Sequence, residues 1–154
     1  MNKSVVQPSS LNIDKVCIDA SLALKWVLPE TYTDRAQKLL RDWITKGYTL
    51  IAPTLFIYEV TSALRNKVYR QIITKEEGFS ALNQIRRGRI ELIISPNLVE
   101  RAWAISEDLE LPTAHDAFYL ALAKEEGCEF WTADKNLVKT LKRHKIRWAM
   151  WIGE

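Results

Sequence analysis

The sequence predicts an α/β protein, with a three-layer α/β/α arrangement around a central, mostly parallel sheet of five strands. First, short apolar runs typical of buried strands alternate with longer stretches of helical periodicity. Second, this alternation favours a mostly parallel sheet with helices covering both of its faces. Third, 154 residues with 47% hydrophobic and 27% charged side chains are typical of one globular domain.

Five strands are predicted from short runs of β-branched, aromatic and other apolar residues. In chain order these runs are Val16–Ile18, Thr49–Ala52, Ile90–Ile94, Phe130–Thr132 and Trp148–Ile152. Helical periodicity or a start signal predicts helices between them. Five of these helices have predicted bounds, which are Leu22–Leu28, Pro53–Val68, Asn97–Leu109, Asp116–Lys124 and Asn136–His144. Two more are predicted from their starts: one begins near Thr33 and includes Ile44, and the other is capped by Thr74.

Local signals set several of the helix ends. Pro29 ends the first helix, because proline cannot continue a helix from its interior. Thr33 is suited to cap the second helix, whose buried stripe spans Ala36–Ile44 and which Gly47 stops. Thr74, followed three residues later by a glutamate, forms a capping box for another helix.

One domain is expected from residue 14 to residue 154, after a polar lead-in at residues 1–13. The longest uncharged run, Gly47–Tyr58, is far shorter than the ~20 residues that span a bilayer. The lead-in has no apolar core of the secretory type, so a cytoplasmic location is expected. Cys17 and Cys128 stand in apolar surroundings and are expected to be buried, reduced thiols.

Several kinds of active site lack the residues that they need. His115 and His144 are the only histidines, which leaves few options for a nucleophile–histidine system or a Cys/His zinc site. The five glycines are dispersed and form no phosphate-binding loop. A phosphatase-like or phospho-aspartate signalling site would need a second acid close to Asp19, where Ser21 stands.

Four acidic residues occupy unusual places. Asp19 directly follows the first predicted strand, and Asp134 follows the fourth. Glu59 lies on an apolar stripe of the helix after the second strand, and Asp116 begins the apolar stripe of a later helix. Because the crevice beyond the carboxyl ends of the strands is the usual functional site of a parallel α/β sheet, the four acids are expected to face it.

Clustered carboxylates favour a divalent cation. Like charges held close together raise each other's pKa unless a positive charge neutralises them, and oxygen ligands select Mg²⁺ or Mn²⁺. Such an ion suits the hydrolysis of a phosphodiester by a metal-activated water. A simpler interpretation makes Asp19 and Asp134 helix N-caps and Asp116 a first-turn acid. Glu59 fits that interpretation least, since no basic residue lies three or four positions away.

The segments around these acids resemble the four signature blocks of PIN-domain ribonucleases, and most closely those of VapC-type toxins from toxin–antitoxin pairs. The matching segments are Cys17–Trp26, Ala52–Val60, His115–Ala123 and Thr132–Leu137. They occur in the expected order and spacing, and together they extend the resemblance over nearly the whole chain. The fold that this resemblance implies is PIN-like.

The resemblance implies an endoribonuclease that depends on Mg²⁺ or Mn²⁺, with Asp19, Glu59, Asp116 and Asp134 as its catalytic and metal-binding acids. Cleavage of RNA would leave 5′-phosphate and 3′-hydroxyl ends. The resemblance also implies a homodimer that a cognate antitoxin protein inhibits. The alternative is a catalytically inactive PIN domain that binds RNA or a protein, which the presence of all four acids disfavours.

Ser21 and Thr132, by their matching positions, would support the site through hydroxyl contacts to Asp134, to a water on the metal or to the substrate. Helix capping and strand packing are the simpler roles for these two hydroxyls. Lys25 and Arg65 are the first candidates for contacts with RNA phosphates, whereas the basic residues of the last helix are expected to form a solvated face.

Two kinds of aromatic residue are expected to be structural. His115 departs from the polar or aromatic residue that the family carries at this position. A structural ring is expected there, with contact to a substrate phosphate as the alternative. Trp26, Trp43 and Trp103 fall on apolar stripes, so they are expected in the core or in a dimer interface.

Overall fold

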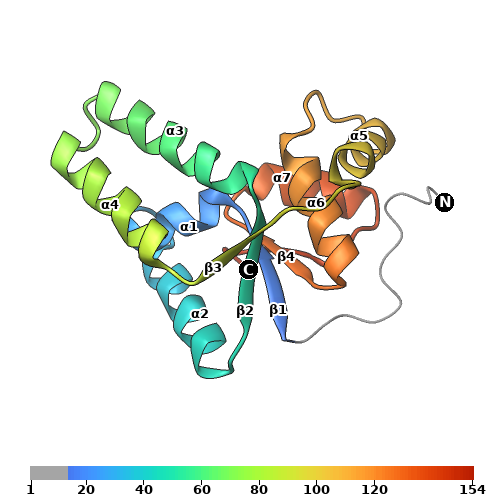
Figure 1. Cartoon of the computed structure of the whole chain (residues 1–154), viewed down its shortest axis with the longest axis horizontal. Helices are drawn as coiled ribbons and strands as arrows, with labels where there is room; N and C mark the ends of the chain where they lie inside the picture. Colours follow the sequence, from blue (N-terminus) through green and yellow to red (C-terminus); the bar gives the residue numbers. More distant parts are fainter. Residues whose placement is uncertain (1–13) are drawn as a thin grey trace.

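The computed structural model describes residues 14–154, so the polar lead-in predicted at residues 1–13 lies outside the described part of the chain. Within residues 14–154 a central sheet is covered by helices on both faces (Figure 1). This arrangement confirms the predicted three-layer α/β/α fold. No helix in the described part of the chain has the length and apolarity needed to cross a membrane.

The sheet contains five strands, all of them parallel. They are β1 (Lys15–Ile18), β2 (Thr49–Pro53), β3 (Ile90–Ile93), β4 (Glu129–Thr132) and β5 (Ala149–Trp151), in the spatial order β3-β2-β1-β4-β5. Cys17 of β1 lies opposite Ile51 of β2 on one side and Phe130 of β4 on the other. The predicted strands are therefore correct to within one residue at each end, and the sheet is wholly rather than mostly parallel.

Seven helices lie between the strands in residues 14–154. They are α1 (Ala20–Val27), α2 (Thr33–Thr45), α3 (Leu55–Tyr69), α4 (Lys75–Arg87), α5 (Leu98–Asp108), α6 (His115–Glu126) and α7 (Lys135–Arg143). In Figure 1, α1, α2 and α4 lie on one side of the sheet and α5 and α6 on the other, while α3 and α4 project as a hairpin away from the strands. The predicted helices are all present.

Helix α6 lies in the middle of the core. Its residues from Tyr119 to Ala123 are all buried, and it packs on β1, β2 and β4. A helix that is apolar on most sides is typical of such a central position. The neighbouring Cys17 and Cys128 are free and fully buried, as expected. The start of α6, which carries Asp116, is consequently held by the best-packed part of the protein.

The predicted cap of the second helix is wrong. Tyr32 precedes the first residue of α2 and has a left-handed backbone, with φ of 69° and no side-chain cap. The Thr33 hydroxyl instead donates to the Leu28 carbonyl at 2.7 Å and accepts from the Glu30 N–H at 2.9 Å. Because the preceding loop uses this hydroxyl, it is not available to the amides of α2.

Ile44, predicted on a buried stripe, is exposed, and so is Trp103, which was expected in the core or in a dimer interface. Ile44 of α2 and Trp103 of α5 are both more than half exposed, and Trp103 reaches 68%. Trp43 is buried and meets Trp131 in an edge-to-face contact at 5.6 Å between ring centroids, and Trp26 is partly buried against the core. Of the three tryptophans, only Trp103 is thus excluded from the core.

Candidate active site

The four acids come from four separate segments at the carboxyl ends of the strands. Asp19 directly follows β1, and Asp134 lies two residues after the end of β4, which pairs with β1 in parallel. Glu59 lies in the second turn of α3, which follows β2, and Asp116 is the second residue of α6. The sheet order explains this grouping, because β2, β1 and β4 are adjacent strands with the same direction.

Asp19 is fixed by three hydrogen bonds. Its Oδ1 accepts from the Ser21 hydroxyl at 2.7 Å and from the Leu22 N–H at 3.0 Å, which caps α1. Its Oδ2 accepts from the Thr132 hydroxyl at 2.5 Å. The carboxylate is only 7% exposed, so these donors offset much of the cost of placing a charge at the edge of the core.

Ser21 and Thr132 connect the ends of β1 and β4. Besides binding Asp19, Thr132 Oγ1 accepts from the Asp134 N–H at 3.0 Å, and Ser21 Oγ accepts from the Ala133 N–H at 3.0 Å. The sequence predicted contacts from these hydroxyls to Asp134, and the structure places Thr132 against the Asp134 main chain rather than its carboxylate. The Asp134 carboxylate instead accepts from the Leu137 N–H at 3.0 Å and caps α7.

The charges of the acids act on one another. Burial raises the pKa of Asp19 to about 6, against the lowering effect of its hydrogen bonds, and the charge of Asp116 adds to the rise. Burial also raises the pKa of Asp116, followed by the charges of Asp134 and Glu59. All four carboxylates therefore contribute to one region of negative potential.

Glu59 has a partner that the sequence did not reveal. The Tyr119 hydroxyl of α6 donates a short hydrogen bond to Glu59 Oε1 of α3. Burial and this bond to Glu59 raise the pKa of Tyr119. Tyr119 follows Asp116 by three positions and was visible in the sequence only as a member of an apolar stripe. The available signal was its hydroxyl, because a buried tyrosine usually requires a polar partner.

The donor set fits a hard divalent cation in chemistry and charge. It consists of carboxylate oxygens whose mutual repulsion a cation would relieve. Within residues 14–154, no group of three or more His, Cys, Asp or Glu side chains is arranged to hold a metal ion as it stands. Binding through one or two carboxylates with waters completing the shell is a common arrangement for Mg²⁺ and needs no such group.

Asp19 and Asp134 are helix N-caps in the structure, as the simpler interpretation of the sequence predicted. Each side chain accepts from a main-chain N–H in the first turn of the helix that it precedes. Only Oδ1 of Asp134 takes part in capping α7, and Oδ2 does not. A cap fixes the direction of a carboxylate, so capping and metal binding are compatible roles for the same residue.

The two basic candidates differ in their surroundings. Lys25 is 17% exposed and forms an ion pair with Glu30 at 3.1 Å, and Lys67 pairs with the same carboxylate at 2.8 Å. Arg65 is exposed on α3, with its guanidinium 5.9 Å from the centre of the Tyr69 ring. His115, the first residue of α6, is exposed rather than packed as a structural ring.

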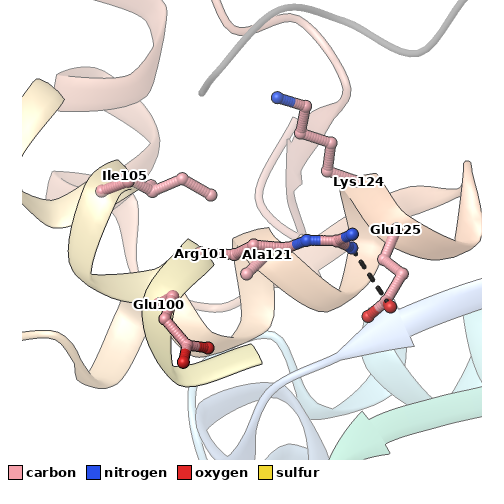
Figure 2. A pocket seen from close by; sticks show the side chains of 7 residues that line it. Glu100, Arg101, Ile105, Ala121, Lys124 and Glu125 are labelled. Carbon is pink, nitrogen blue, oxygen red and sulfur yellow. Dashed lines mark ion pairs between the residues drawn. The ribbon is translucent and has the colours of Figure 1, made fainter. Parts of the chain in front are cut away.

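A separate cavity lies between α5 and α6 (Figure 2). Its volume is about 470 Å³, and none of the four acids lines it. Arg101 of α5 pairs across it with Glu125 of α6 at 3.1 Å. Because Glu100 and Lys124 also line the cavity, its acidic and basic side chains balance and indicate no particular ligand.

Comparison with known proteins identifies the family. The PIN domain family matches residues 16–142, which includes all four acids. The chain belongs to the PIN domain family. VapC ribonuclease Mb0985 of Mycobacterium bovis is 32% identical over 125 residues, a match that covers 81% of this chain and 90% of the relative. Ribonuclease VapC9 of Mycobacterium tuberculosis matches to the same extent.

Solved structures show the same fold for this PIN domain. PAE2754 from Pyrobaculum aerophilum superposes with a TM-score of 0.64 over 90% of this chain and 91% of that chain, at 19% identity. VapC20 of Mycobacterium tuberculosis, a toxin that cleaves the sarcin–ricin loop, superposes with a TM-score of 0.59 over 80% and 93%, at 15% identity. The PIN-like fold implied by the sequence motifs is therefore confirmed.

Proposed function

We propose that this PIN domain is a Mg²⁺- or Mn²⁺-dependent endoribonuclease and the toxin of a toxin–antitoxin pair. The observation that carries the proposal is the grouping of the four acids at the carboxyl ends of adjacent strands. In agreement with this grouping, burial raises the pKa of Asp116, and the charges of Asp134 and Glu59 raise it further. Relatives named VapC ribonucleases, at 32% identity, support RNA as the substrate.

Each acid has a distinct part in this proposal. Asp19 is held by Ser21, Thr132 and the first turn of α1, so it offers a fixed charge at the end of β1. Asp116 and Asp134 stand at the starts of α6 and α7, and Glu59 reaches the site from α3. A bound divalent ion would neutralise these charges and activate a water molecule for attack on a phosphodiester. The site residues supply its ligands and set its position.

A cleavage assay tests the proposal. Purified protein is incubated with mixed RNAs in Mg²⁺, in Mn²⁺ and with a chelator, beside Asp19→Asn and Asp116→Asn. We expect cleavage in either metal, its loss with the chelator, and a loss of at least about 100-fold in both variants. Asp42→Asn is the matched control, because Asp42 lies on α2 in an exposed ion pair with Lys38. Equal cleavage by all four proteins would refute the assignment.

A PIN domain that binds RNA or a protein without cleaving is the second candidate. It is favoured by one observation: both oxygens of Asp19 already accept hydrogen bonds. Retention of intact RNA by the wild-type protein in both Mg²⁺ and Mn²⁺ would support this candidate over the nuclease.

The proposal includes a homodimer, a cognate antitoxin and action in the cytoplasm. For the dimer, the support is the exposed apolar surface of α5, where Val99 and Trp103 are both about two-thirds exposed. The two side chains lie one turn apart on the same face of α5, and aromatic residues are enriched in protein interfaces. Trp103→Glu should lower the mass measured by sedimentation from that of a dimer to that of a monomer, and an unchanged mass would exclude α5 from the interface.

A further inference from the structure

We propose that Tyr119 is a positioning residue, whose hydroxyl holds the Glu59 carboxylate in the orientation that binds the divalent ion. This inference rests on the proposed function, because it assigns Glu59 to the metal site. It concerns a residue that touches neither the metal nor the RNA and acts only through Glu59.

The Tyr119 ring is immobilised on every side. It is 1% exposed within the core, and it packs against the Phe130 ring of β4 at 6.0 Å between centroids. The main chain of the same residue is also engaged, since its carbonyl accepts from the Cys17 thiol of β1 at 3.7 Å. The hydroxyl therefore sits at a fixed point, from which it donates to Glu59 Oε1.

Glu59 depends on this one donor. Within residues 14–154 the Glu59 carboxylate has no other hydrogen-bond partner, whereas Asp19 has three. Glutamate also has one more rotatable bond than aspartate, so more conformations are lost when it is fixed. One donor on Oε1 selects a single direction for the carboxylate and leaves Oε2 for the ion.

Packing alone does not explain the hydroxyl. A phenylalanine would fill the same core volume beside Phe130 without the cost of burying a polar atom. Among the described residues the hydroxyl has Glu59 as its one partner, and this bond connects α3 to α6. Because Asp116 lies one turn before Tyr119 on α6, the same helix carries one acid and the donor that orients another.

The test removes the hydroxyl and keeps the ring. Tyr119→Phe is compared with wild type by calorimetric titration with Mn²⁺ and by thermal unfolding in a chelator. We expect Mn²⁺ binding to weaken about 10- to 100-fold, which is typical when the partner of a metal ligand is removed. Tyr58→Phe, the exposed tyrosine next to Glu59, is the matched control and should bind Mn²⁺ like wild type.

A double variant separates positioning from general stability. In a Glu59→Gln background, Tyr119→Phe should cause no further loss of Mn²⁺ affinity, because the hydroxyl acts through the Glu59 carboxylate. An equal further loss in that background would overturn the inference. If Glu59→Gln itself leaves Mn²⁺ binding unchanged, the metal site of the proposed function fails. If Glu59→Gln weakens binding and Tyr119→Phe does not, the positioning role alone fails.

A second measurement does not need the Tyr119→Phe variant. Among the described residues Tyr119 is the one buried tyrosine. In protein labelled with 3-fluorotyrosine, Glu59→Gln should shift its fluorine resonance, and Mg²⁺ should shift the same resonance in the wild type. Mg²⁺ binding that leaves this resonance unmoved would overturn the inference, even if Tyr119→Phe does not fold, whereas the absence of Mg²⁺ binding would refute the proposed metal site.

Discussion

Thr132 has no exposed surface, and yet it is the residue through which the segments of two acids are joined. Its hydroxyl donates to Asp19 and accepts from the N–H of Asp134. At the scale of single residues, this is how the end of the sheet fixes the site. Asp19, Glu59 and Asp134 are each oriented by a neighbour that is not itself charged.

Thr132→Val should destabilise the protein by about 1–3 kcal/mol. Valine keeps the shape of threonine but leaves the Asp19 Oδ2 and the Asp134 N–H without this partner, and unpaired buried polar groups carry a cost of that size. The measurement is urea denaturation in a chelator. Thr132→Ser, which keeps the hydroxyl and removes the methyl group, is the control and should lose less. A loss in Thr132→Val no larger than that in Thr132→Ser would contradict the importance of the hydroxyl.

Asp19 should make stability fall as the pH rises. Its pKa is raised from 3.8 to about 6 in the folded protein, so between these values the folded state holds a proton that the unfolded chain has lost. The free energy of unfolding should therefore decrease from about pH 4 to pH 7, by up to about 3 kcal/mol. The free energy of unfolding is measured against pH by urea denaturation in a chelator, for the wild type and for Asp19→Asn, and the difference between the two curves isolates the contribution of Asp19. A difference that does not change with pH would contradict the prediction.

At the scale of elements, helices α3 and α4 approach each other closely at one point of their hairpin. Gly78 of α4 faces Val68 of α3 so closely that an added Cβ would lie 2.7 Å from Val68 Cγ2. Glycine therefore occupies the interior of α4, where it is a poor helix former. The hairpin matters for function because its first helix carries Glu59.

Gly78→Ala should destabilise the protein by about 1 kcal/mol, because the contact with the stiff Val68 side chain costs more than alanine gains in helix propensity. In a Val68→Ala background, where the Cγ2 atom is absent, the same change should become stabilising by up to about 1 kcal/mol. Chemical denaturation of the four proteins measures both effects. The same sign in both backgrounds would exclude this contact as the cause.

The elements could be predicted from the sequence much better than their side-chain partners. Strand and helix positions depend on local periodicity, and β1 and α6 follow that rule. The four acids were also recognisable, since Asp19, Asp116 and Asp134 lie at or next to element ends and Glu59 lies on an apolar stripe inside a helix. The Glu59–Tyr119 and Asp19–Thr132 contacts join residues 60 and 113 positions apart, and no local pattern specifies such pairs. Thr33 was misassigned for a related reason, because its hydroxyl serves the preceding loop.

At the scale of the whole molecule, the net charge of +3 combines an acidic site with a basic remainder. From Val60 to Lys75 the chain carries four basic residues and no acidic one, and this stretch directly follows Glu59. Anionic RNA would be attracted to the basic remainder, while the uncompensated acids would repel it.

Binding of single-stranded RNA to the Asp116→Asn variant should weaken with added salt, by about 0.7 in the log–log slope for each phosphate contacted. Adding Arg65→Ala should make that slope shallower, because Arg65 is exposed. Adding Lys25→Met instead should leave the slope unchanged, since Lys25 is already paired with Glu30. Fluorescence anisotropy at several salt concentrations measures this. A shallower slope with Lys25→Met would contradict the importance of that ion pair.

The central position of β1 also determines how the site responds to local unfolding. Strand β1 is hydrogen-bonded on both sides and buried, so its amides should be among the last to exchange with solvent. Asp19, Asp116 and Asp134 are attached to this slowly exchanging part through β1, α6 and β4. Glu59 alone lies on the projecting hairpin, and opening of that hairpin would detach one of four acids while the sheet stayed folded. We therefore expect the completeness of the site to depend on how stably this hairpin is held against the rest of the protein.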